Sequence, residues 1–503
     1  MTQQPIREII IVGGGTAGWM SAAALSRFLP RQQTRIRLVE SEAIGTVGVG
    51  EATIPTIQSF NAMLGIDEDA FVAATGATFK LGIRFTDWRK RGETYFHPFG
   101  RFGHDMEGMD FHKLFLKLAR QNRCADIWQY APSAVAAAAG KFERPHSPAK
   151  TPFDHLSYAF HFDASRYAQF LRQYAEEHGA ERVEGKITHV TTHSETGFVD
   201  QLTLADGQTL SADLFIDCSG FRGLLIEGTL ETGYEDWSHW LPCDRAVALP
   251  TQNVGKPVPY THATAREAGW QWHIPLQHRT GNGLVYSSRY MDDDRAEALL
   301  LSNLNGQPLS SPRKLSFTTG RRKSLWNRNV VAIGLSGGFL EPLESTSIHL
   351  IQTGIAKLIA LFPDKRFLPV EMAEYNRLMR NAYDGVRDFI ILHYHATQRN
   401  DSPFWDHVRT MSVPDTLTHK MELFRSKGRF FRFEDELFST PNWVAVFLGQ
   451  GIVPEELDQF VDALDDDKLA HSFEEMRQLI RQNVARMPDQ SEFIRLHCAA
   501  PEG

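Results

Sequence analysis

A short apolar run near the N-terminus is followed by glycines and then by a helical pattern. Residues 7–12 are rich in β-branched side chains, which is typical of a buried parallel strand. Apolar residues recur with helical spacing from about residue 17 to 28, and a second strand is predicted over residues 35–40. This order of strand, helix and strand predicts the start of a doubly wound α/β fold.

The middle of the chain changes from helical to alternating spacing. Residues 163–178 have a helical pattern, with Asp163 or Ser165 as N-cap and Gly179 just past the end. From residue 186 to 217 the period is two, and residues 205–208 are typical of a hairpin turn. We therefore expect an inserted antiparallel meander whose last strand covers residues 214–217.

Helical patterns dominate the remainder of the chain. A further parallel strand is predicted over residues 329–333, followed by helices over the ranges 347–362, 371–394, 454–464 and 472–484. Residues 140–152 and 306–312 carry Pro and Gly and are predicted to be surface loops. The expected architecture is an α/β body with an inserted antiparallel sheet over residues 1–362 and a helical cap over residues 363–503.

Composition limits the classes of function. The chain has 503 residues, 42% of them hydrophobic, and a formal net charge of −8 without a long basic run, which disfavours nucleic acid as a partner. No apolar window is long enough to span a bilayer and no leader pattern is present, so a cytoplasmic protein is expected. The four cysteines show no C-x-x-C spacing, and His189 and His193 fall in a period-two stretch where four residues span roughly 13 Å. We expect no metal site and a small ligand held in a pocket.

The glycine run after the first strand carries a dinucleotide fingerprint. Residues 13–18 fit G-x-G-x-x-G between strand and helix, where Gly13, Gly15 and Gly18 permit a tight turn and close approach to a pyrophosphate. Glu40, at the end of the second strand, is placed to accept a hydrogen bond from a ribose hydroxyl. The alternative is a strand-to-helix turn that is merely tight.

Two further features are ambiguous when each is taken by itself. Trp270 and Trp272 have the i, i+2 spacing that puts both indoles on one face of a strand, where they either cover a cofactor or belong to an ordinary core strand. Lys80 lies in the apolar run Phe79-Lys80-Leu81. Such a lysine usually extends its ammonium to solvent, but when buried it is a donor or nucleophile with a lowered pKa.

Residues 341–347 precede the predicted helix that starts at residue 347. Thr346 and Ser347 are either simple capping residues or part of an anion site made by free backbone N–H groups. Glu341 and Glu344 are either solvated acids of the first turn or acid/base partners for a lysine. Another motif, His97-Pro98-Phe99, is either a stacking site for a flat ring or an ordinary aromatic cluster.

Taken together, these motifs resemble the FAD-dependent halogenases of the tryptophan-halogenase family, and the resemblance covers most of the chain. The W-x-W-x-I-P motif is that family's specific mark. The matching segments are residues 13–19, residues 48–55, Lys80, residues 270–275, residues 342–346, residues 389–394 and residues 401–405.

The resemblance implies a flavin-monooxygenase-like fold, with a Rossmann-type FAD domain, an inserted antiparallel sheet and a helical C-terminal part. Reduced FAD from a separate flavin reductase would react with oxygen to give a flavin hydroperoxide, which oxidises chloride or bromide to hypohalous acid. Lys80 would deliver the halogen to a small aromatic, as a haloamine or as a hydrogen-bonded oxidant. Glu344 would polarise the oxidant, or stabilise the cationic ring and remove its proton.

The resemblance also assigns binding roles. Trp270 and Trp272 would separate the substrate from the flavin, and His97 and Phe99 would bracket the aromatic ring. Backbone amides of Thr346 and Ser347 would bind halide. The implied flavin contacts are Gly13, Gly14, Gly15, Ala17, Gly18, Glu40, Ser41, Ile44, Val47, Val49, Ala52, Val190, Leu335 and Ile348.

The chain departs from the family in two places. Ser347 stands where the family has glycine, which reshapes the expected halide site. Asn442-Trp443-Val444 and Gln450 stand where tryptophan halogenases carry a tyrosine pair and a glutamate that hold the amino acid. We therefore expect indole or a similar heteroaromatic as substrate rather than free tryptophan.

The alternatives are a flavin-dependent aromatic hydroxylase, a free-tryptophan halogenase and a non-catalytic flavin-binding protein. The motifs leave open the natural substrate, the choice between chloride and bromide, the regiochemistry and whether the chain forms a homodimer.

Overall fold

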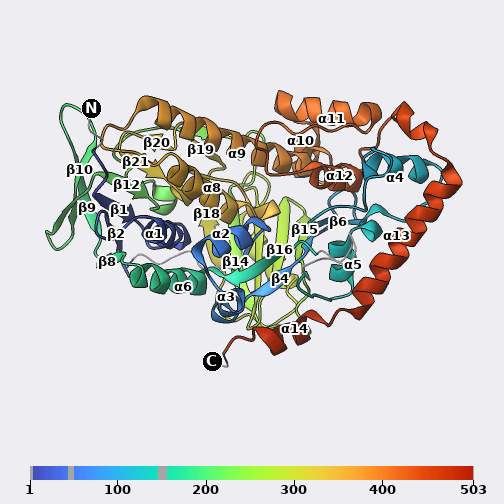
Figure 1. The fold of residues 1–503 in the computed structure, drawn as a ribbon, viewed down its shortest axis with the longest axis horizontal. Helices are drawn as coiled ribbons and strands as arrows, with labels where there is room; N and C mark the ends of the chain where they lie inside the picture. The colour runs from blue at the N-terminus through green and yellow to red at the C-terminus, as the bar shows by residue number, and fades with distance from the viewer. Residues whose placement is uncertain (1–3, 44–49, 146–155, 502–503) are drawn as a thin grey trace.

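The computed structural model describes residues 4–43, 50–145 and 156–501. The predicted flavin contacts Ile44, Val47 and Val49 lie outside these ranges. In Figure 1 the N-terminal strands lie on the left, the large sheet crosses the centre, and helices of the last third run along the top and the right-hand margin.

A six-stranded sheet forms the N-terminal side of the molecule. Its strand order is β20-β21-β12-β1-β2-β8, and every neighbouring pair is parallel except β20 with β21. The strands are β1 (Glu8–Val12), β2 (Arg35–Glu40), β8 (Glu181–Glu184), β12 (Leu214–Asp217), β20 (Trp326–Asn327) and β21 (Val330–Ala332). With α1 (Thr16–Phe28) packed against α6 (Ala164–Glu177), the sheet confirms the doubly wound start that the sequence predicts.

Residues 187–211 of the predicted meander form a separate three-stranded sheet, but its expected last strand is β12, which pairs in parallel with β1 in the six-stranded sheet. The three-stranded sheet consists of β9 (Ile187–Thr192), β10 (Val199–Leu204) and β11 (Thr209–Ser211), all antiparallel. Its apolar side chains pack against β2 and β12 in a small second core that includes Val39, Leu202 and Phe215. The meander therefore packs on the outer side of the six-stranded sheet.

A larger sheet of seven strands, which the sequence pattern did not reveal, forms the centre of the molecule. Its order is β18-β14-β17-β16-β15-β5-β6, and only β5 with β15 is parallel. The strands are β5 (Gly82–Thr86), β6 (Thr94–Pro98), β14 (Arg245–Thr251), β15 (Thr261–Arg266), β16 (Gly269–Pro275), β17 (Thr280–Tyr286) and β18 (Arg313–Ser316). This sheet carries the tryptophan pair on β16 and His97 on β6.

The remaining elements surround these sheets. Small sheets are formed by β3 (Gly50–Ala52), β4 (Thr78–Lys80) and β7 (Ala159–Asp163), and by β13 (Tyr234–Asp236), β19 (Gly320–Arg322) and β22 (Gly338–Phe339). Besides α1 and α6, the α-helices described before residue 303 are α2 (Thr56–Leu64), α3 (Glu68–Thr75), α4 (Phe111–Arg120), α5 (Pro132–Ala138) and α7 (Asp293–Ser302).

The last third of the chain is helical, as predicted, with one exception. Its helices are α8 (Ser347–Ala360), α9 (Pro369–His395), α10 (Pro403–Thr410), α11 (Asp415–Lys427), α12 (Thr440–Gly449), α13 (Asp466–Arg486) and α14 (Gln490–His497). The helix expected over residues 454–464 is wrong, because only Gln459–Ala463 form a short 3-10 turn. The N–H groups of Glu455 and Glu456 donate instead to carbonyls of Arg425 and Ser426 in the last turn of α11. The expected division at residue 362 falls between α8 and α9 and stays a prediction.

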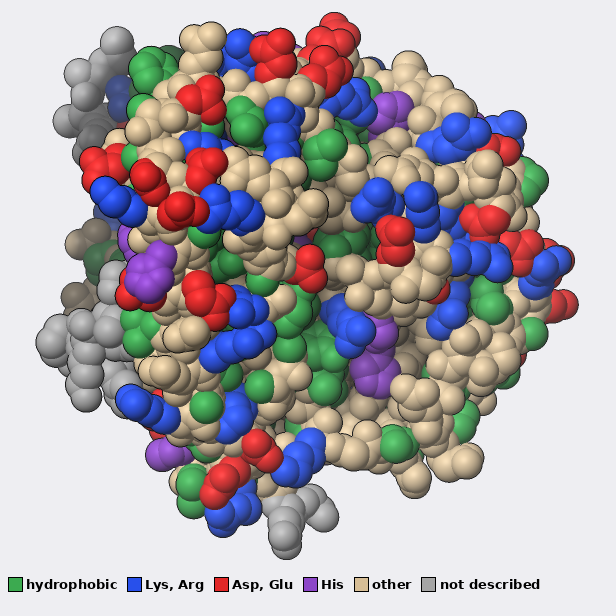
Figure 2. Space-filling model, turned by 90° about the vertical axis from the view of Figure 1, so that its right-hand side faces the viewer, with side chains coloured by type: hydrophobic (Ala, Val, Ile, Leu, Met, Phe, Trp, Pro, Cys, Tyr) green, Lys and Arg blue, Asp and Glu red, His purple; other side chains and the backbone are tan. Residues whose placement is uncertain are grey.

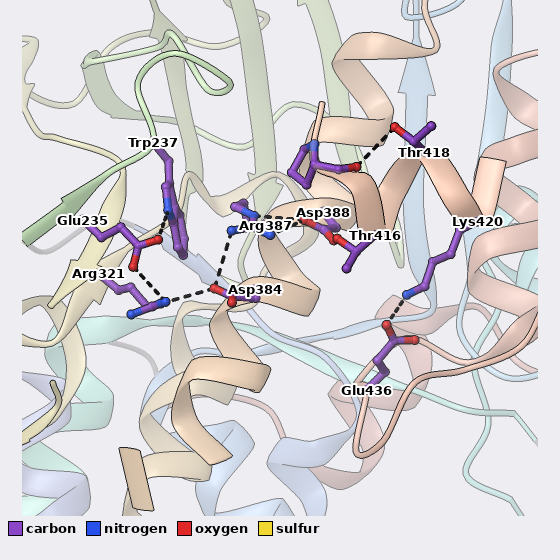
Figure 3. A network of polar contacts seen from close by, with 11 residues as sticks. Glu235, Trp237, Arg321, Asp384, Arg387, Asp388, Thr416, Thr418, Lys420 and Glu436 are labelled. Atoms are coloured by element: carbon purple, nitrogen blue, oxygen red, sulfur yellow. Dashed lines mark hydrogen bonds and ion pairs between the residues drawn. The ribbon is translucent and has the colours of Figure 1, made fainter. Parts of the chain in front are cut away.

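A network of buried charges and aromatic rings joins α9 to the body (Figure 3). Arg321 on β19 lies 2.8 Å from Glu235 and 3.2 Å from Asp384 on α9. One turn further along α9, the Arg387 guanidinium lies 5.0 Å from the ring centre of Trp237. These contacts fix the rotation of α9 on the sheet, and with it the direction in which the next turns of α9 point.

A second buried pair holds the segment between α11 and α12. Lys420 on α11 bonds Glu436, and their side chains are 2% and 8% exposed. The Lys420 ammonium also lies 4.4 Å from the ring centre of Trp443 on α12. The pair therefore ties α11, α12 and the loop that joins them.

One face of the molecular surface mixes both signs of charge. Figure 2, which faces the right-hand side of Figure 1, shows Lys and Arg interspersed with Asp and Glu over this face. Among the described residues, no helix combines the length and apolar character needed to cross a bilayer.

We predict that Lys420→Met costs about 3 kcal/mol of stability, because it leaves the Glu436 carboxylate buried without a partner. The double variant Lys420→Met/Glu436→Leu should regain most of that loss. The measurement is the thermal unfolding midpoint, with Lys427→Met as control because its pair with Glu456 is exposed. A single variant as stable as the parent would contradict a structural role for the pair.

Candidate functional site

The glycine turn after β1 is built for close approach of a ligand. Gly13 has φ +110°, and a Cβ there would lie 2.3 Å from the carbonyl oxygen of Cys218. A Cβ on Gly14 would lie 1.5 Å from the Glu40 carboxylate, and one on Gly18 would lie 1.8 Å from the Gly13 carbonyl oxygen. Within the described ranges no side chain caps α1, so its first N–H groups stay available. The turn thus fits a pyrophosphate at the helix N-terminus, as in dinucleotide-binding folds.

Glu40 has the position and the support expected of a ribose-binding acid. It ends β2 directly beside the glycine turn, and its Oε1 lies 2.5 Å from Nε of Arg182. Arg182 in turn contacts Glu42 and Glu184, so the carboxylate is held by a charge network at the sheet edge. These residues fit the ribose end of a dinucleotide such as FAD.

The other described residues predicted to bind flavin fall on several elements. Gly334, which begins the 3-10 turn that carries Leu335, lies so close to α1 that a Cβ there would be 2.7 Å from Cβ of Ala17. Ile348 is buried on α8, which packs against α1. Ser41 directly follows β2, Ala52 lies in β3, and Val190 lies in β9. Their contacts with flavin stay a prediction.

The tryptophan pair lies on one face of β16, as the spacing predicts. The ring centres of Trp270 and Trp272 are 6.0 Å apart, and both side chains are buried. Gly283 on β17 makes room for Trp272, since a Cβ there would lie 2.0 Å from the indole. Trp270 donates through Nε1 to Glu341 Oε2 at 2.7 Å. Both indoles are therefore fixed by their surroundings.

Glu341 is buried and acts as a support for Trp270. Its Oε2 accepts a second hydrogen bond from Tyr394 at 2.7 Å. Burial raises the pKa of Glu341 to about 7, although its bonds to Tyr394 and Trp270 oppose the rise. The interpretation of this residue as a solvated acid is wrong.

Lys80 is fully buried, which rules out the usual arrangement with an ammonium in solvent. Its Nζ donates to the carbonyl oxygen of Thr53 at 3.0 Å and to Oγ of Ser345 at 2.8 Å. The Nζ also lies 5.1 Å from the ring centre of Phe99. Burial lowers the pKa of Lys80 to about 7, even though the negative Glu344 raises it. Near neutral pH the amine is therefore available in its uncharged form.

Glu344 is buried between two imidazoles. His97 Nδ1 lies 2.9 Å from Oε2, and His393 Nε2 lies 2.7 Å from Oε1. Burial would raise the pKa of Glu344, but the two histidines outweigh it and lower the pKa to about 2. Glu344 is therefore a carboxylate near neutral pH. It makes no ion pair with Lys80 within 4 Å among the described residues, so the two groups act from separate positions.

A chain of hydrogen bonds fixes the tautomer of His97. The Ser439 N–H donates to Oδ1 of Asn442 at 2.8 Å, which sets the orientation of the amide. Asn442 Nδ2 therefore donates to Nε2 of His97 at 2.9 Å. In the neutral ring the proton is then on Nδ1, directed at the Glu344 carboxylate.

A second chain supports His393. Gln450 Nε2 donates to the His393 carbonyl oxygen at 3.0 Å and lies 3.4 Å from the Tyr95 hydroxyl. The Tyr95 hydroxyl lies 2.8 Å from Nδ1 of His393. Because His393 Nε2 faces a carboxylate, its proton belongs there and Nδ1 accepts from Tyr95. Sequence reasoning missed this support, since His393 and Tyr95 are 298 positions apart and no local pattern links them.

The start of α8 has the geometry of an anion site. Ser345 adopts a left-handed conformation with φ 59°, Thr346 is the N-cap, and α8 begins at Ser347. The Thr346 hydroxyl is buried and has no hydrogen-bond partner within the described part of the chain. First-turn N–H groups and the helix dipole favour a negative charge at this point. Through Ser345 the same place is directly linked to Lys80.

The positions expected to hold an amino-acid group offer none of the side chains needed. Trp443 and Val444 are buried in α12, at 1% and 0% exposure. Gln450 is also buried, and its amide is used by Tyr95 and His393. No tyrosine hydroxyl or carboxylate is therefore supplied from these three positions.

Comparison with known proteins agrees with the geometry. The family model for tryptophan halogenase matches residues 8–466. The structure of a flavin-dependent halogenase from Xanthomonas campestris has 48% sequence identity and a TM-score of 0.96, and it covers 99% of this chain and 100% of its own. One from Brevundimonas sp. BAL3 has 48% identity and a TM-score of 0.94, over 97% and 99%.

A tryptophan 6-halogenase from Streptomyces toxytricini is 33% identical over 97% of each chain. The chain belongs to the tryptophan-halogenase family and is a flavin-dependent halogenase, an oxidoreductase that uses FADH2 and halide.

Proposed function

We propose that the protein halogenates an electron-rich aromatic without an amino-acid group, such as indole, by transferring halogen through Lys80. The observation that carries this proposal is the buried Nζ of Lys80, held between Thr53 and Ser345, which directly precedes the N-cap of α8. A separate flavin reductase supplies reduced FAD. The bound flavin, with oxygen, supplies the oxidising power that turns halide into hypohalous acid.

The chain's own groups arrange the first part of the reaction. The glycine turn and Glu40 hold the dinucleotide, and N–H groups of Thr346 and Ser347 hold the halide. Trp270 and Trp272 keep the aromatic substrate away from the flavin, which prevents direct oxygen insertion. The Glu341 carboxylate holds Trp270, and Trp272 packs against Gly283, so both indoles are fixed. They therefore act as a static barrier rather than as a moving lid.

Lys80 then takes up the halogen. When the amine is neutral, its two N–H bonds are directed to Thr53 and Ser345, and the lone pair remains free. This lone pair attacks the halogen of hypohalous acid. The N–X bond forms, the O–X bond breaks, and hydroxide leaves as water with a proton from the amine. A haloamine on Lys80 results.

Glu344 acts on the aromatic ring. As the ring attacks the halogen of the haloamine, the C–X bond forms and the N–X bond breaks. The N–X electron pair stays on the Lys80 nitrogen, which takes a proton from water to restore the amine, while positive charge develops on the ring. A carboxylate that stays ionised stabilises that charge and accepts the ring proton. His97 and Phe99 bracket the ring, the N–H of His97 orients the carboxylate, and the His393 ring lies 2.7 Å from it.

We predict that Lys80→Met abolishes halogenation and raises the thermal midpoint by roughly 5 °C at pH 6. In the folded protein the Lys80 pKa is about 7, below its ordinary value of 10.5, so burying the cation costs stability. This cost is full below pH 7 and disappears as pH rises toward 10.5, because the unfolded chain then also loses its proton. The gain in midpoint should therefore shrink at pH 9. Retained halogenation would overturn the role of Lys80.

We predict that Tyr95→Phe lowers kcat roughly 10-fold or more with little change in KM, as outer-layer supports of site residues do. Without the hydroxyl, His393 loses the bond that keeps its proton directed at Glu344. The matched control is Tyr174→Phe, whose hydroxyl bonds the Leu64 carbonyl oxygen away from the site. Equal kcat in the two variants would contradict this role for Tyr95.

The substrate is tested with FAD, a flavin reductase, NADH, and bromide or chloride. We expect halogen isotope patterns in the product mass with indole, and kcat/KM for indole at least roughly 10-fold above that for free tryptophan, since buried Val444 and Gln450 offer no handles. Oxygenated product formed without halide would favour a hydroxylase instead. Preference for tryptophan would overturn the substrate assignment while leaving the halogenase intact.

A further inference from the structure

The seven-stranded sheet has a second hollow on the face opposite the tryptophan pair. Because side chains alternate along a strand, Gln271 and His273 point away from the face of Trp270 and Trp272. Together with His262, Thr264 and Arg266 on the neighbouring β15, they line a cleft of about 530 Å³. The segments 253–258 and 302–305 form its sides, and none of its lining residues is acidic.

Arg266 is the distinctive group in this cleft. Its Nε and Nη2 both donate to the same neutral oxygen, Oε1 of Gln271, at 3.0 and 2.6 Å. No carboxylate lies within 4.0 Å of its guanidinium in the described ranges, although Arg399 nearby is paired with Asp401. Burial lowers the pKa of Arg266, an effect that Asp87 opposes. Arg266 therefore has a carboxylate, Asp87, in its neighbourhood but no direct ion pair among the described residues, and it faces a cleft with no acidic side chain in its described lining.

The surroundings add to the positive potential. Lys256 stands in the cleft wall and makes an exposed pair with Asp489. Arg84 on β5 is the register partner of His262 and is exposed. Burial lowers the pKa of His262 to about 4, so near neutral pH this ring is an uncharged hydrogen-bonding group.

We propose that this cleft binds a small organic or inorganic anion that bears phosphate or carboxylate groups, with Arg266 as its principal ligand. The volume lies within the range of small-molecule sites, and exceeds what a single halide ion needs. The guanidinium is planar and is already oriented by Gln271, which suits bidentate binding of an oxyanion. The cleft shares no described lining residue with the glycine turn or with Lys80, and its residues on β15 and β16 point to the face opposite the tryptophan pair.

The test is calorimetric titration of the full chain, saturated with FAD so that the glycine turn is occupied, at fixed chloride. Pyrophosphate and citrate are the two probes, and the better of them assigns the phosphate or the carboxylate class. We expect one saturable site, and at least a tenfold loss of affinity in Arg266→Met. Arg245→Met serves as control, because that arginine lies on β14 and is paired with Asp293.

A second variant guards against a folding defect in the first. Thr264→Trp keeps Arg266 and fills the cleft from a partly exposed position, so it should also abolish binding. Unchanged thermal midpoints and FAD affinities in both variants would show that the fold is retained. No binding of either probe to the parent, or equal affinity in the parent and both variants, would overturn the proposal.

Discussion

Burial of ionisable groups is the constraint on which the site depends. Lys80 and Glu344 are both removed from water, yet their environments push them in opposite directions. Among the described residues the hydrogen-bond partners of the lysine are a carbonyl and a hydroxyl, so burial favours its neutral form. The glutamate has two imidazoles, which keep its charge. One group can therefore act as a nucleophile and the other as an anion at the same pH.

The architecture is arranged to keep these environments distinct. Lys80 ends the short strand β4 and bonds Ser345, just before α8. Glu344 is contacted by His97 from β6 and by His393 from the buried turns of α9. The rotation of α9 is fixed at a distance by Arg321, Asp384 and Arg387 (Figure 3). These contacts lie on the same helix as His393, whose ring is 2.7 Å from Glu344.

The spacing of apolar residues and glycines correctly predicted those elements that are determined by neighbouring residues in the sequence. The strand, glycine turn and helix around residues 8–28 follow from β-branched residues, positive φ at Gly13 and helical spacing, and the structure confirms them. The helix expected near residue 460 failed because long-range partners took its N–H groups at Glu455 and Glu456. Lys80, Glu344 and the tryptophan pair were found from motifs. The supports from Tyr95, His393 and Asn442 exist only through pairings hundreds of residues apart.

Strand β16 is used on both of its faces, and this limits how the strand itself can change. Gly269 has φ +155°, and a Cβ there would lie 2.0 Å from the Val285 carbonyl oxygen, so the first residue of the strand is pinned. A one-residue insertion after it would exchange the two faces, bringing Gln271 and His273 inward and turning the indoles outward. A substitution in β16 can alter the side chains of one face alone. A change in the length of β16 would disturb the residues on both faces.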